Sequence, residues 1–463
     1  MFTILVPAYA GLLSEETPMK RKRTKLLSAA LLSFGMLFVA GAQSQSFATT
    51  FNVMHNFGGT DGYFPQATLA MDGSGNFYGT AWIGGTGSEG VVYELSPSGT
   101  GWTQTILWNF CAGGGSCADG SQPTAPVIVD TSGNLYGTTS TGGANGKGTV
   151  FKLTHTGSTW SESVLYSFGA TASDGAAPMS RLTYAGASSG ALYPGTGALY
   201  GTTNAGGSGM FAVGTVYSLK KVSGVWTETV LYNFCSVNTP SSCEDGAQPG
   251  AGGVTLDSSG HLYGIAGYGE FGSGLLYELI KTGGTWGQTR LYAFCPTLLT
   301  CTDGHFATGS NVIIDATGAI IGTMDAGGDY TNVSDGGGVI FKYSGGTEQV
   351  LYAFCQVWDS TSGECEDGHG PSQGGSLVLD SSGNLYGTTL LGGGPNPNDP
   401  GQAYRLDSSN GFHSLHKFCA RTNCSDGEFP EGGLITDASG NLYGTAYNGG
   451  TGSQHGTVFQ IIP

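Results

Sequence analysis

One short stretch returns seven times along this 463-residue chain and limits the folds that the chain can adopt. Its clearest copy is Asp130–Thr139, with the sequence Asp-Thr-Ser-Gly-Asn-Leu-Tyr-Gly-Thr-Thr. The other copies are residues 72–80, 197–203, 257–264, 315–323, 380–389 and 437–445. Equivalent positions (76, 134, 198, 261, 319, 384 and 441) lie 58, 64, 63, 58, 65 and 57 residues apart. A period this regular is the signature of one repeat architecture rather than of several unrelated domains.

Each period divides into four short segments with the composition of β-strands. In the second copy these are Pro126–Asp130, Asn134–Thr139, Thr149–Leu153 and Trp160–Phe168. They are rich in β-branched and aromatic residues, and Gly-containing turns separate them; the Asp-x-Ser-Gly-Asn links fit tight hairpins that act as scaffold. The 83 glycines follow no Gly-X-Y period, which excludes collagen. Four antiparallel strands in each of seven repeats predict an all-β fold, a seven-bladed β-propeller.

The two ends of the chain complement each other. Residues 50–57 have the pattern of a lone fourth strand, whereas the last repeat, within residues 433–461, has three strands and lacks its fourth. We therefore expect the N-terminal strand to complete the last blade, which closes the ring and removes two exposed sheet edges. On this interpretation residues 50–463 form a single propeller domain, with the continuous apolar strand of each repeat innermost.

The first 42 residues differ from the rest of the chain. Basic residues between Lys20 and Lys25 precede the apolar run Leu26–Ala40, and the small residues Ala40-Gly41-Ala42 follow. This three-part pattern predicts a secretory signal peptide over residues 1–42, for which Met19 is a more usual start than Met1. The apolar run is short for a membrane span. We therefore expect a protein that is secreted, at the cell surface or in the periplasm, with no membrane span in the mature chain.

The ten cysteines form five close pairs. The pairs are Cys111 and Cys117, Cys235 and Cys243, Cys295 and Cys301, Cys355 and Cys365, and Cys419 and Cys424. Each pair lies between the Phe that ends the fourth segment of one repeat and the Asp-Gly that opens the next. We expect five disulfides across these loops, as is typical of exported proteins. Metal thiolates are the alternative, but the spacings vary, unlike the C-x2-C knuckles of zinc sites.

The Asp-Gly-x-x-Pro motif opens six repeats, and Asp303–Ala307 takes its place in the seventh without the Pro. Asp-Gly is turn chemistry and Pro presets the entry of a strand, which favours a structural role over a ring of cation sites. The residue after Gly differs between repeats. In order it is Tyr63, Ser121, Ala176, Ala247, His305, His369 and Glu428.

Three successive repeats thus carry His305, His369 and Glu428 at equivalent positions, which we expect near the mouth of the ring's axis. Two His and a carboxylate can hold a divalent cation with open coordination sites. The alternative is that they are solvated loop side chains, since the sequence identifies no supporting groups around them. Asp303 and Asp367, in the same connections, complete the candidate catalytic set. No cofactor is predicted beyond this cation, since the chain has no P-loop, nucleophile elbow or His-Glu-x-x-His motif.

The charge of the chain limits its partners. The formal net charge is −17, and the predicted signal peptide holds five basic but only two acidic residues, so the mature chain is more acidic still. A surface of this kind argues against nucleic acid or an anionic membrane as partner. We expect a monomer.

The combined motifs resemble a known family. These motifs are Ser-Gly-Asn-Leu-Tyr-Gly-Thr-Thr, Gly-Thr-Val-Phe at 148–151 and 456–459, and Val-Leu-Tyr-x-Phe at 164–168 and 230–234. Together they resemble the GloVer tandem repeat of bacterial exported proteins, over residues 50–463. The resemblance implies export and supplies no activity. Members of that family often end in a surface-anchoring segment, whereas this chain ends Ile461-Ile462-Pro463, so we expect free secretion or periplasmic residence.

Two functions are compatible with these observations. The first is a non-enzymatic binding module for a glycan, a protein or a small ligand, which would use the loops between blades on one face. The second is a propeller hydrolase or lyase with a metal-assisted site at the axis mouth, where Asp303, His305, Asp367, His369 and Glu428 would gather. The lack of a familiar catalytic constellation favours the first.

Overall fold

The computed structural model describes residues 49–463 apart from 158, 240–241, 270–271, 297–300, 308–310, 329–335, 361–363, 372–376, 394–399 and 453. The expected signal peptide, residues 1–42, lies outside the described residues. In the described part, the helical elements are the short 3-10 helices η1 (Ala187–Ser189) and η2 (Thr422–Cys424). No helix found there is long and apolar enough to cross a membrane.

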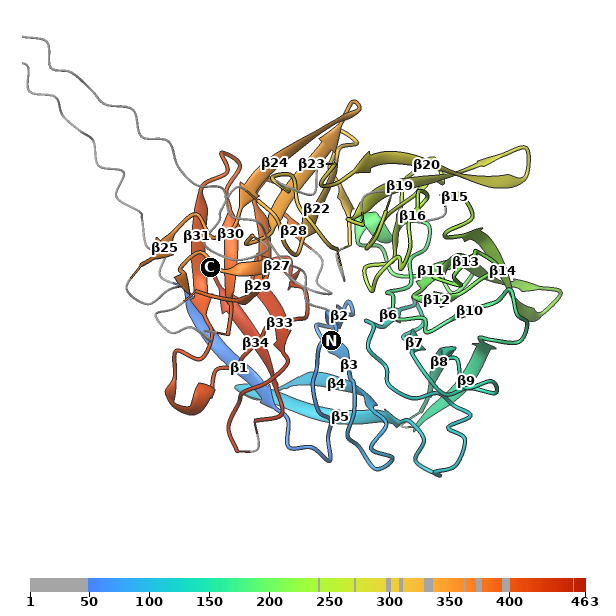
Figure 1. Cartoon of the computed structure of the whole chain (residues 1–463). Coiled ribbons are helices and arrows are strands. Elements are labelled where there is room, and N and C mark those ends of the chain that lie inside the picture. Colours follow the sequence, from blue (N-terminus) through green and yellow to red (C-terminus); the bar gives the residue numbers. More distant parts are fainter. Residues whose placement is uncertain are drawn as a thin grey trace, which may run out of the picture. The chain divides into compact units, whose positions relative to one another are not determined.

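Seven antiparallel sheets follow one another around a central axis, which confirms the predicted seven-bladed propeller (Figure 1). From the inner to the outer strand, the first four blades are β2 (Ala70–Met71), β3 (Phe77–Ala81), β4 (Val91–Ser98) and β5 (Gly101–Asn109); β6 (Ile128–Val129), β7 (Leu135–Thr139), β8 (Thr149–Thr156) and β9 (Thr159–Ser167); β11 (Leu199–Thr203), β13 (Thr215–Val222) and β14 (Val225–Asn233); and β17 (Val254–Leu256), β18 (Leu262–Ala266), β19 (Leu275–Thr282) and β20 (Thr285–Ala293).

The remaining three blades follow the same order. They are β21 (Ile313–Ile314), β22 (Ile320–Met324), β23 (Val339–Ser344) and β24 (Thr347–Ala353); β28 (Val378–Leu379), β29 (Leu385–Leu391), β30 (Gln402–Leu406) and β31 (Phe412–Lys417); and β32 (Ile435–Thr436), β33 (Leu442–Ala446), β34 (Thr457–Ile462) and β1 (Thr50–Asn56). Three two-stranded sheets in the connections pair β10 (Gly175–Ala176) with β12 (Ala205–Gly206), β15 (Asn238–Thr239) with β16 (Ser242–Cys243), and β25 (Trp358–Asp359) with β26 (Glu364–Cys365).

Two blades depart from the expected four strands. In the third blade the inner segment is not a regular strand, and Thr183 makes only an isolated bridge to Tyr200. This repeat lacks the turn Asp and instead has an insertion that contains η1. The inner segment is therefore not joined to β11 by the tight turn found in the other blades. In the sixth blade β27 (His369–Pro371) also pairs with β29, which makes a sheet of five strands.

The N-terminal strand lies in the last blade. β1 pairs with β34 in antiparallel register from Thr50 opposite Ile462 to Asn56 opposite Thr457, and it takes the outer position of that sheet. On the neighbouring connections, the ring of Phe64 stacks on Tyr447 with 4.3 Å between centroids and an 8° angle. Strand pairing and ring stacking thus join the two ends of the described chain.

The repeated Asp organises the turn between the two innermost strands. Asp130 Oδ1 accepts the backbone N–H groups of Ser132 and Asn134 at 2.8 and 2.9 Å. Its Oδ2 accepts the Asn134 side-chain amide at 2.8 Å and the Tyr136 hydroxyl at 3.1 Å. Asp72, Asp380 and Asp437 make the same four contacts. This network explains why Asp, Asn and Tyr recur at fixed spacing, and it confirms that the motif is scaffold.

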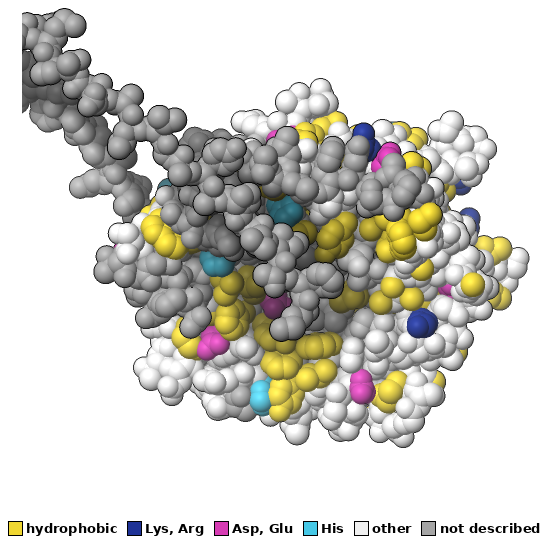
Figure 2. Space-filling view, in the orientation of Figure 1, with side chains coloured by type: hydrophobic (Ala, Val, Ile, Leu, Met, Phe, Trp, Pro, Cys, Tyr) yellow, Lys and Arg dark blue, Asp and Glu magenta, His cyan; other side chains and the backbone are white. Residues whose placement is uncertain are grey.

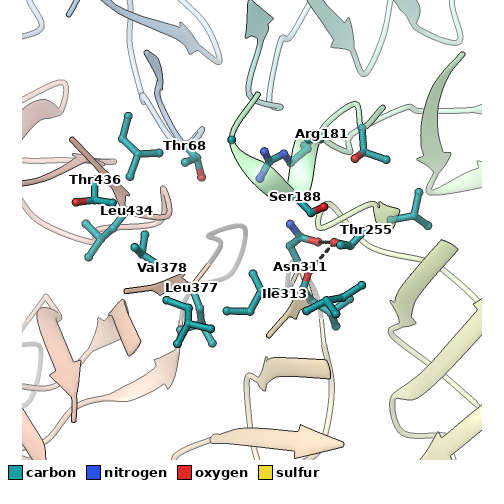
Figure 3. A pocket seen from close by; sticks show the side chains of 18 residues that line it. Thr68, Arg181, Ser188, Thr255, Asn311, Ile313, Leu377, Val378, Leu434 and Thr436 are labelled. Carbon is teal, nitrogen blue, oxygen red and sulfur yellow. Dashed lines mark hydrogen bonds between the residues drawn. The ribbon is translucent and has the colours of Figure 1, made fainter. Parts of the chain in front are cut away.

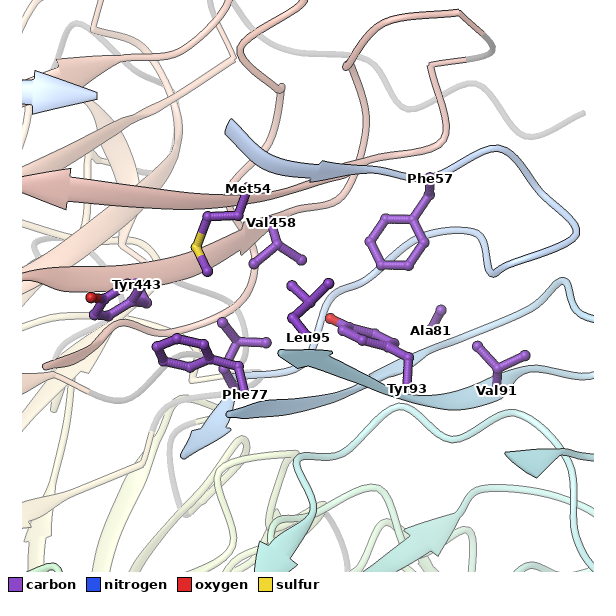
Figure 4. Packing of buried hydrophobic residues seen from close by; sticks show 10 residues of the cluster. Met54, Phe57, Phe77, Ala81, Val91, Tyr93, Leu95, Tyr443 and Val458 are labelled. Carbon is purple, nitrogen blue, oxygen red and sulfur yellow. The ribbon is translucent and has the colours of Figure 1, made fainter. Parts of the chain in front are cut away.

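An aromatic pair bridges every junction between neighbouring blades. Phe110, just beyond β5, meets Phe151 on β8 of the next blade edge to face, with 5.1 Å between ring centroids. The seven equivalent pairs are Phe57–Tyr93, Phe110–Phe151, Phe168–Tyr217, Phe234–Tyr277, Phe294–Phe341, Phe354–Tyr404 and Phe418–Phe459, with centroids 4.9 to 5.2 Å apart. Figure 4 shows the pair that joins the last blade to the first. We call these contacts the junction pairs.

The second ring of each junction pair lies against a glycine. Gly137 on β7 is directly opposite Phe151 on β8, and a Cβ added to Gly137 would lie 2.6 Å from the Phe151 Cζ atom. At the seven equivalent glycines the added Cβ would lie 2.3 to 2.8 Å from the nearest atom of the aromatic side chain. A strand glycine often marks such a close approach. The repeated motif Leu-Tyr-Gly-Thr therefore has Gly at this position because the aromatic ring occupies the space of a side chain, and not because the chain turns there.

Replacing Gly137 with Ala should therefore destabilise the protein. The added methyl group overlaps the Phe151 ring, and overpacking of this kind costs roughly 1–3 kcal/mol of unfolding free energy. Gly101→Ala is the matched control, because a Cβ there meets nothing within 4 Å. Urea denaturation of both variants measures the difference. Equal stability of the two variants would show that the ring contact is not constrained.

A polar position on the outer strands distinguishes the blades. Gln104 and Gln288 donate from Nε2 to the backbone carbonyls of Asp61 and Asp245, at 3.0 and 2.7 Å. Glu162, Glu228 and Glu348 take the equivalent place in three other blades, and each has a buried Oε1 without a hydrogen-bond partner. Burial is the main cause that raises the pKa of these three carboxyls, to about 8 for Glu162 and about 7 for Glu228 and Glu348. The second cause is the charge of a nearby Asp, which is Asp119, Asp174 and Asp303 respectively. When protonated, each Glu can donate as Gln does.

The Glu228→Gln variant tests this interpretation through the pH dependence of stability. The pKa of Glu228 is raised from 4.5 to about 7 on folding, so its contribution to stability is fully present below about pH 4.5 and is lost as the pH rises through 7. We expect Glu228→Gln to unfold at a higher urea concentration than wild type at pH 8, and at nearly the same concentration at pH 4.5. The exposed Glu366→Gln serves as control. A constant difference between Glu228→Gln and wild type at both pH values would contradict this interpretation.

Candidate functional site

The Asp of each Asp-Gly connection anchors the loop that precedes it. Asp303 accepts hydrogen bonds from the Tyr292 hydroxyl at 2.8 Å and from the Cys295 backbone N–H at 3.1 Å. Asp367 accepts from the Tyr352 hydroxyl at 2.7 Å and from the Gln356 N–H at 2.9 Å. The other five accept a side-chain hydrogen bond from His55, Trp108, Tyr166, Tyr232 and His416. This geometry favours the structural role of the motif.

The same connections hold the five predicted disulfides, all of which are present. They join Cys111 to Cys117, Cys235 to Cys243, Cys295 to Cys301, Cys355 to Cys365, and Cys419 to Cys424. Each bond lies next to an anchoring Asp, as when the Cys295 N–H donates to Asp303. The disulfide and the Asp carboxylate together fix each of these five connections. The residue that differs between repeats comes two positions after this Asp.

His305, His369 and Glu428 occupy equivalent positions on three neighbouring connections. Their backbones pair with Ala326, Leu391 and Asn448 respectively, which lie at the end of the second strand of each blade or just beyond it. The His305 ring contacts Phe306, with 3.7 Å between centroids. Burial lowers the pKa of His369 and, with the charge of Asp426, raises the pKa of Glu428. Each side chain therefore has its own blade and its own surroundings.

The structure does not bring these three residues together as a metal triad. Across the described residues, the only three His, Cys, Asp or Glu whose ligand atoms lie within 4.8 Å of one another are Cys419, Cys424 and Glu428. Both of those sulfurs are in a disulfide, so they cannot act as thiolate ligands. The blades hold His305 and His369 apart from Glu428.

The inner segments of the blades enclose a cavity on the axis. It has a larger part of about 380 Å³ and an adjoining part of about 220 Å³, which share Thr68, Arg181, Ala187, Gly190, Ile435 and Thr436 in their walls. Most of the wall comes from strands β17, β21, β28 and β32 and from the residues before them, with Ile313, Leu377, Val378 and Leu434 as apolar members. The continuous apolar strand is therefore innermost, as predicted.

Polar side chains gather on one side of this cavity (Figure 3). Arg181 and Ser188, from the third blade, lie near Thr255 and Asn311, and the Thr255 hydroxyl donates to Asn311 Oδ1 at 2.9 Å. Leu377, Val378 and Leu434 lie on the other side, together with Thr436. The cavity thus combines a mainly apolar wall with a few polar groups, the usual composition of a small-molecule site.

Arg181 is the only Lys or Arg among the described residues that line the two parts of the cavity. The Arg181 side chain is half-buried. Burial lowers the pKa of its guanidinium, and the nearby Tyr184 phenol has the opposite effect. The guanidinium nevertheless stays charged at neutral pH. No Asp or Glu is among the described residues that line either part of the cavity. Sequence analysis missed Arg181, although a signal existed. At the equivalent position the other blades have Thr68, Pro126, Gly253, Asn311, Ser376 and Gly433, none of them charged.

On one face of the propeller, the visible charged side chains of the described residues do not cluster. On the face seen in Figure 2, hydrophobic side chains form a band over the inner part of the ring, while the visible Lys, Arg, Asp and Glu side chains are scattered. The blades run anticlockwise in Figure 1 and clockwise in Figure 3, so Figure 3 views the cavity from the opposite face. The axial cavity is therefore the candidate site.

The metal hypothesis from the sequence has a direct test. Because His305, His369 and Glu428 do not converge, we expect EDTA to leave the melting temperature unchanged. We also expect a His305→Ala, His369→Ala double variant to hold as much divalent metal as wild type, measured by inductively coupled plasma mass spectrometry. A stoichiometric ion that is present in wild type and lost in the double variant would establish the triad instead.

Comparison with known proteins places the chain in a family. A search of curated proteins finds no match. Solved structures of low similarity include a puromycin hydrolase (11% identity, TM-score 0.47, 84% of this chain and 51% of that one), a putative 6-phosphogluconolactonase from Bacteroides uniformis (14%, 0.43, 76% and 84%) and an α-L-arabinanase from Penicillium chrysogenum (14%, 0.41, 77% and 98%).

Identities this low carry no information on activity. The family comparison is decisive, because the model of the Gloeobacter/Verrucomicrobia repeat matches residues 33–196, 119–333 and 308–463, which together span almost the whole chain. The chain therefore belongs to the Gloeobacter/Verrucomicrobia repeat family, in agreement with the resemblance of its motifs.

Proposed function

We propose that this protein is an exported, non-enzymatic propeller that binds a small, mainly apolar ligand in its axial cavity. One observation carries the proposal: the larger part of the cavity has about 380 Å³ and joins an apolar wall to a few polar groups. Ligand sites of folded proteins have volumes of about 300–1,000 Å³ and this composition. The remaining blade positions supply scaffold.

The third blade supports this assignment. Its inner segment contributes Arg181 and Thr183 to the cavity wall, and its insertion adds Ala187, Ser188 and Gly190. No other repeat has this insertion. A departure from the repeat that falls on the cavity wall supports a role in binding, because the scaffold alone would need no such change.

The cysteines support an exported setting for the protein. Five disulfides are typical of proteins that work in an oxidising compartment, outside the cell or in the periplasm. Together with the predicted signal peptide they support export. We propose that the protein acts there as a monomer and that it acquires its ligand from the surrounding medium.

The neutral fluorescent probe N-phenyl-1-naphthylamine tests the site. We expect saturable binding to wild type with an increase in fluorescence, since the probe leaves water for an apolar cavity. Ser188→Trp places a large ring at the cavity wall and should abolish this signal, whereas Ser188→Ala, the matched control, should retain it. Near-ultraviolet circular dichroism verifies that both variants are folded. Equal binding by wild type and Ser188→Trp would place the probe elsewhere and overturn the proposal.

A further inference from the structure

One charged side chain, that of Arg181, is among the described residues that line the cavity. Arg181 lies where the two parts of the cavity adjoin, since it belongs to the walls of both. Its half-buried guanidinium carries up to five N–H donors in a planar fork, a geometry that matches a carboxylate.

We infer that the ligand of the axial cavity is an amphipathic carboxylate, an acid with a single carboxylate and a hydrocarbon body. Arg181 would bind the carboxylate, and the apolar wall of Ile313, Val378 and Ile435 would cover the hydrocarbon. This inference rests on the proposed function, because it specifies the ligand of the same cavity.

The charges of the groups around the cavity favour an anionic ligand. A guanidinium that is partly withdrawn from water gains most from an anionic partner, since the surrounding medium screens charge less than water does. The described walls of the cavity hold no Asp or Glu, and the neighbouring Tyr184 has its pKa raised by burial, so its phenol is neutral at pH 7. An incoming carboxylate would therefore meet no like charge from the described walls.

The arrangement of neutral polar groups supports a carboxylate with an apolar body over a polyanion or a sugar acid. Ser188, Thr255 and Asn311 lie on the same side as Arg181, and Thr255 is already engaged with Asn311. The opposite side has Leu377, Val378 and Leu434, which offer no hydrogen bond from their side chains, and Thr436, whose hydroxyl already donates to the Asp437 carbonyl at 3.2 Å. A second charged group or a row of hydroxyls placed there would lose its hydration without replacement.

Titration calorimetry with octanoate, octanol and octylamine at pH 7 tests the inference. These probes share a chain length and differ in the charge of the head group. We expect wild type to bind octanoate roughly ten- to a hundredfold more tightly than octanol, as a charge-assisted hydrogen bond provides, and octylamine more weakly than either. In Arg181→Met the preference for octanoate over octanol should disappear, while Arg181→Lys should keep part of it, since Lys retains the charge but not the fork.

Controls separate this inference from the proposed function. Lys220→Met removes one exposed positive charge from the same blade and should leave octanoate binding unchanged. If octanoate and octanol bind equally to wild type, or if Arg181→Met keeps the preference, the carboxylate assignment is wrong although the cavity still binds. If neither the three probes nor N-phenyl-1-naphthylamine binds to folded wild type, both the assignment and the proposed function fail. Octanoate binding that Ser188→Trp does not affect would place the site elsewhere and overturn the assignment.

Discussion

The junction pairs are the interaction on which the rest of the structure depends. Each blade is a small sheet that cannot bury both of its faces alone, and seven hydrophobic clusters lie between neighbouring blades. In every cluster a Phe from one blade meets an aromatic ring of the next edge to face, and that ring fits against a strand glycine. The ring fills the space over the strand glycine and the Phe fills the space between two blades, so the same contact recurs at all seven junctions.

Much of this fold could be predicted because its signals are local. Asp130, Asn134 and Tyr136 interact within one hairpin, so their spacing in the sequence is already the geometry of the turn. The cysteine pairs are equally local, since each disulfide closes a single connection. By contrast, the reason for Gly137 required knowledge of Phe151 across the hairpin and of Phe110 in the preceding blade. These residues are visible in the sequence, but which rings contact one another cannot be predicted from it.

The candidate site was less predictable, for a physical reason. Residues at equivalent positions of a repeat are related by rotation about the axis, so equivalence does not imply proximity. His305, His369 and Glu428 are equivalent and yet stay on separate connections, whereas Arg181 and Asn311, which are equivalent positions of the inner segments, line one wall together with Ser188. Side chains from several blades meet around the axis, where the inner segments lie. Variation along those segments is therefore more informative about function than variation in the outer connections.

The pairing of β1 with β34 has a consequence for the order in which the molecule forms. Most contacts of a blade lie within one repeat or between successive repeats, so they can form as the chain emerges. β1 is synthesised before every other strand of the propeller, yet its partner, from Thr457 to Ile462, is the last. Until that partner arrives, the strand edges of β1 and of the growing sheet stay unpaired, and unpaired edges invite association with other chains. The completed ring is thus a feature of the finished chain alone, and the interval before closure is when the molecule is most exposed to misassembly.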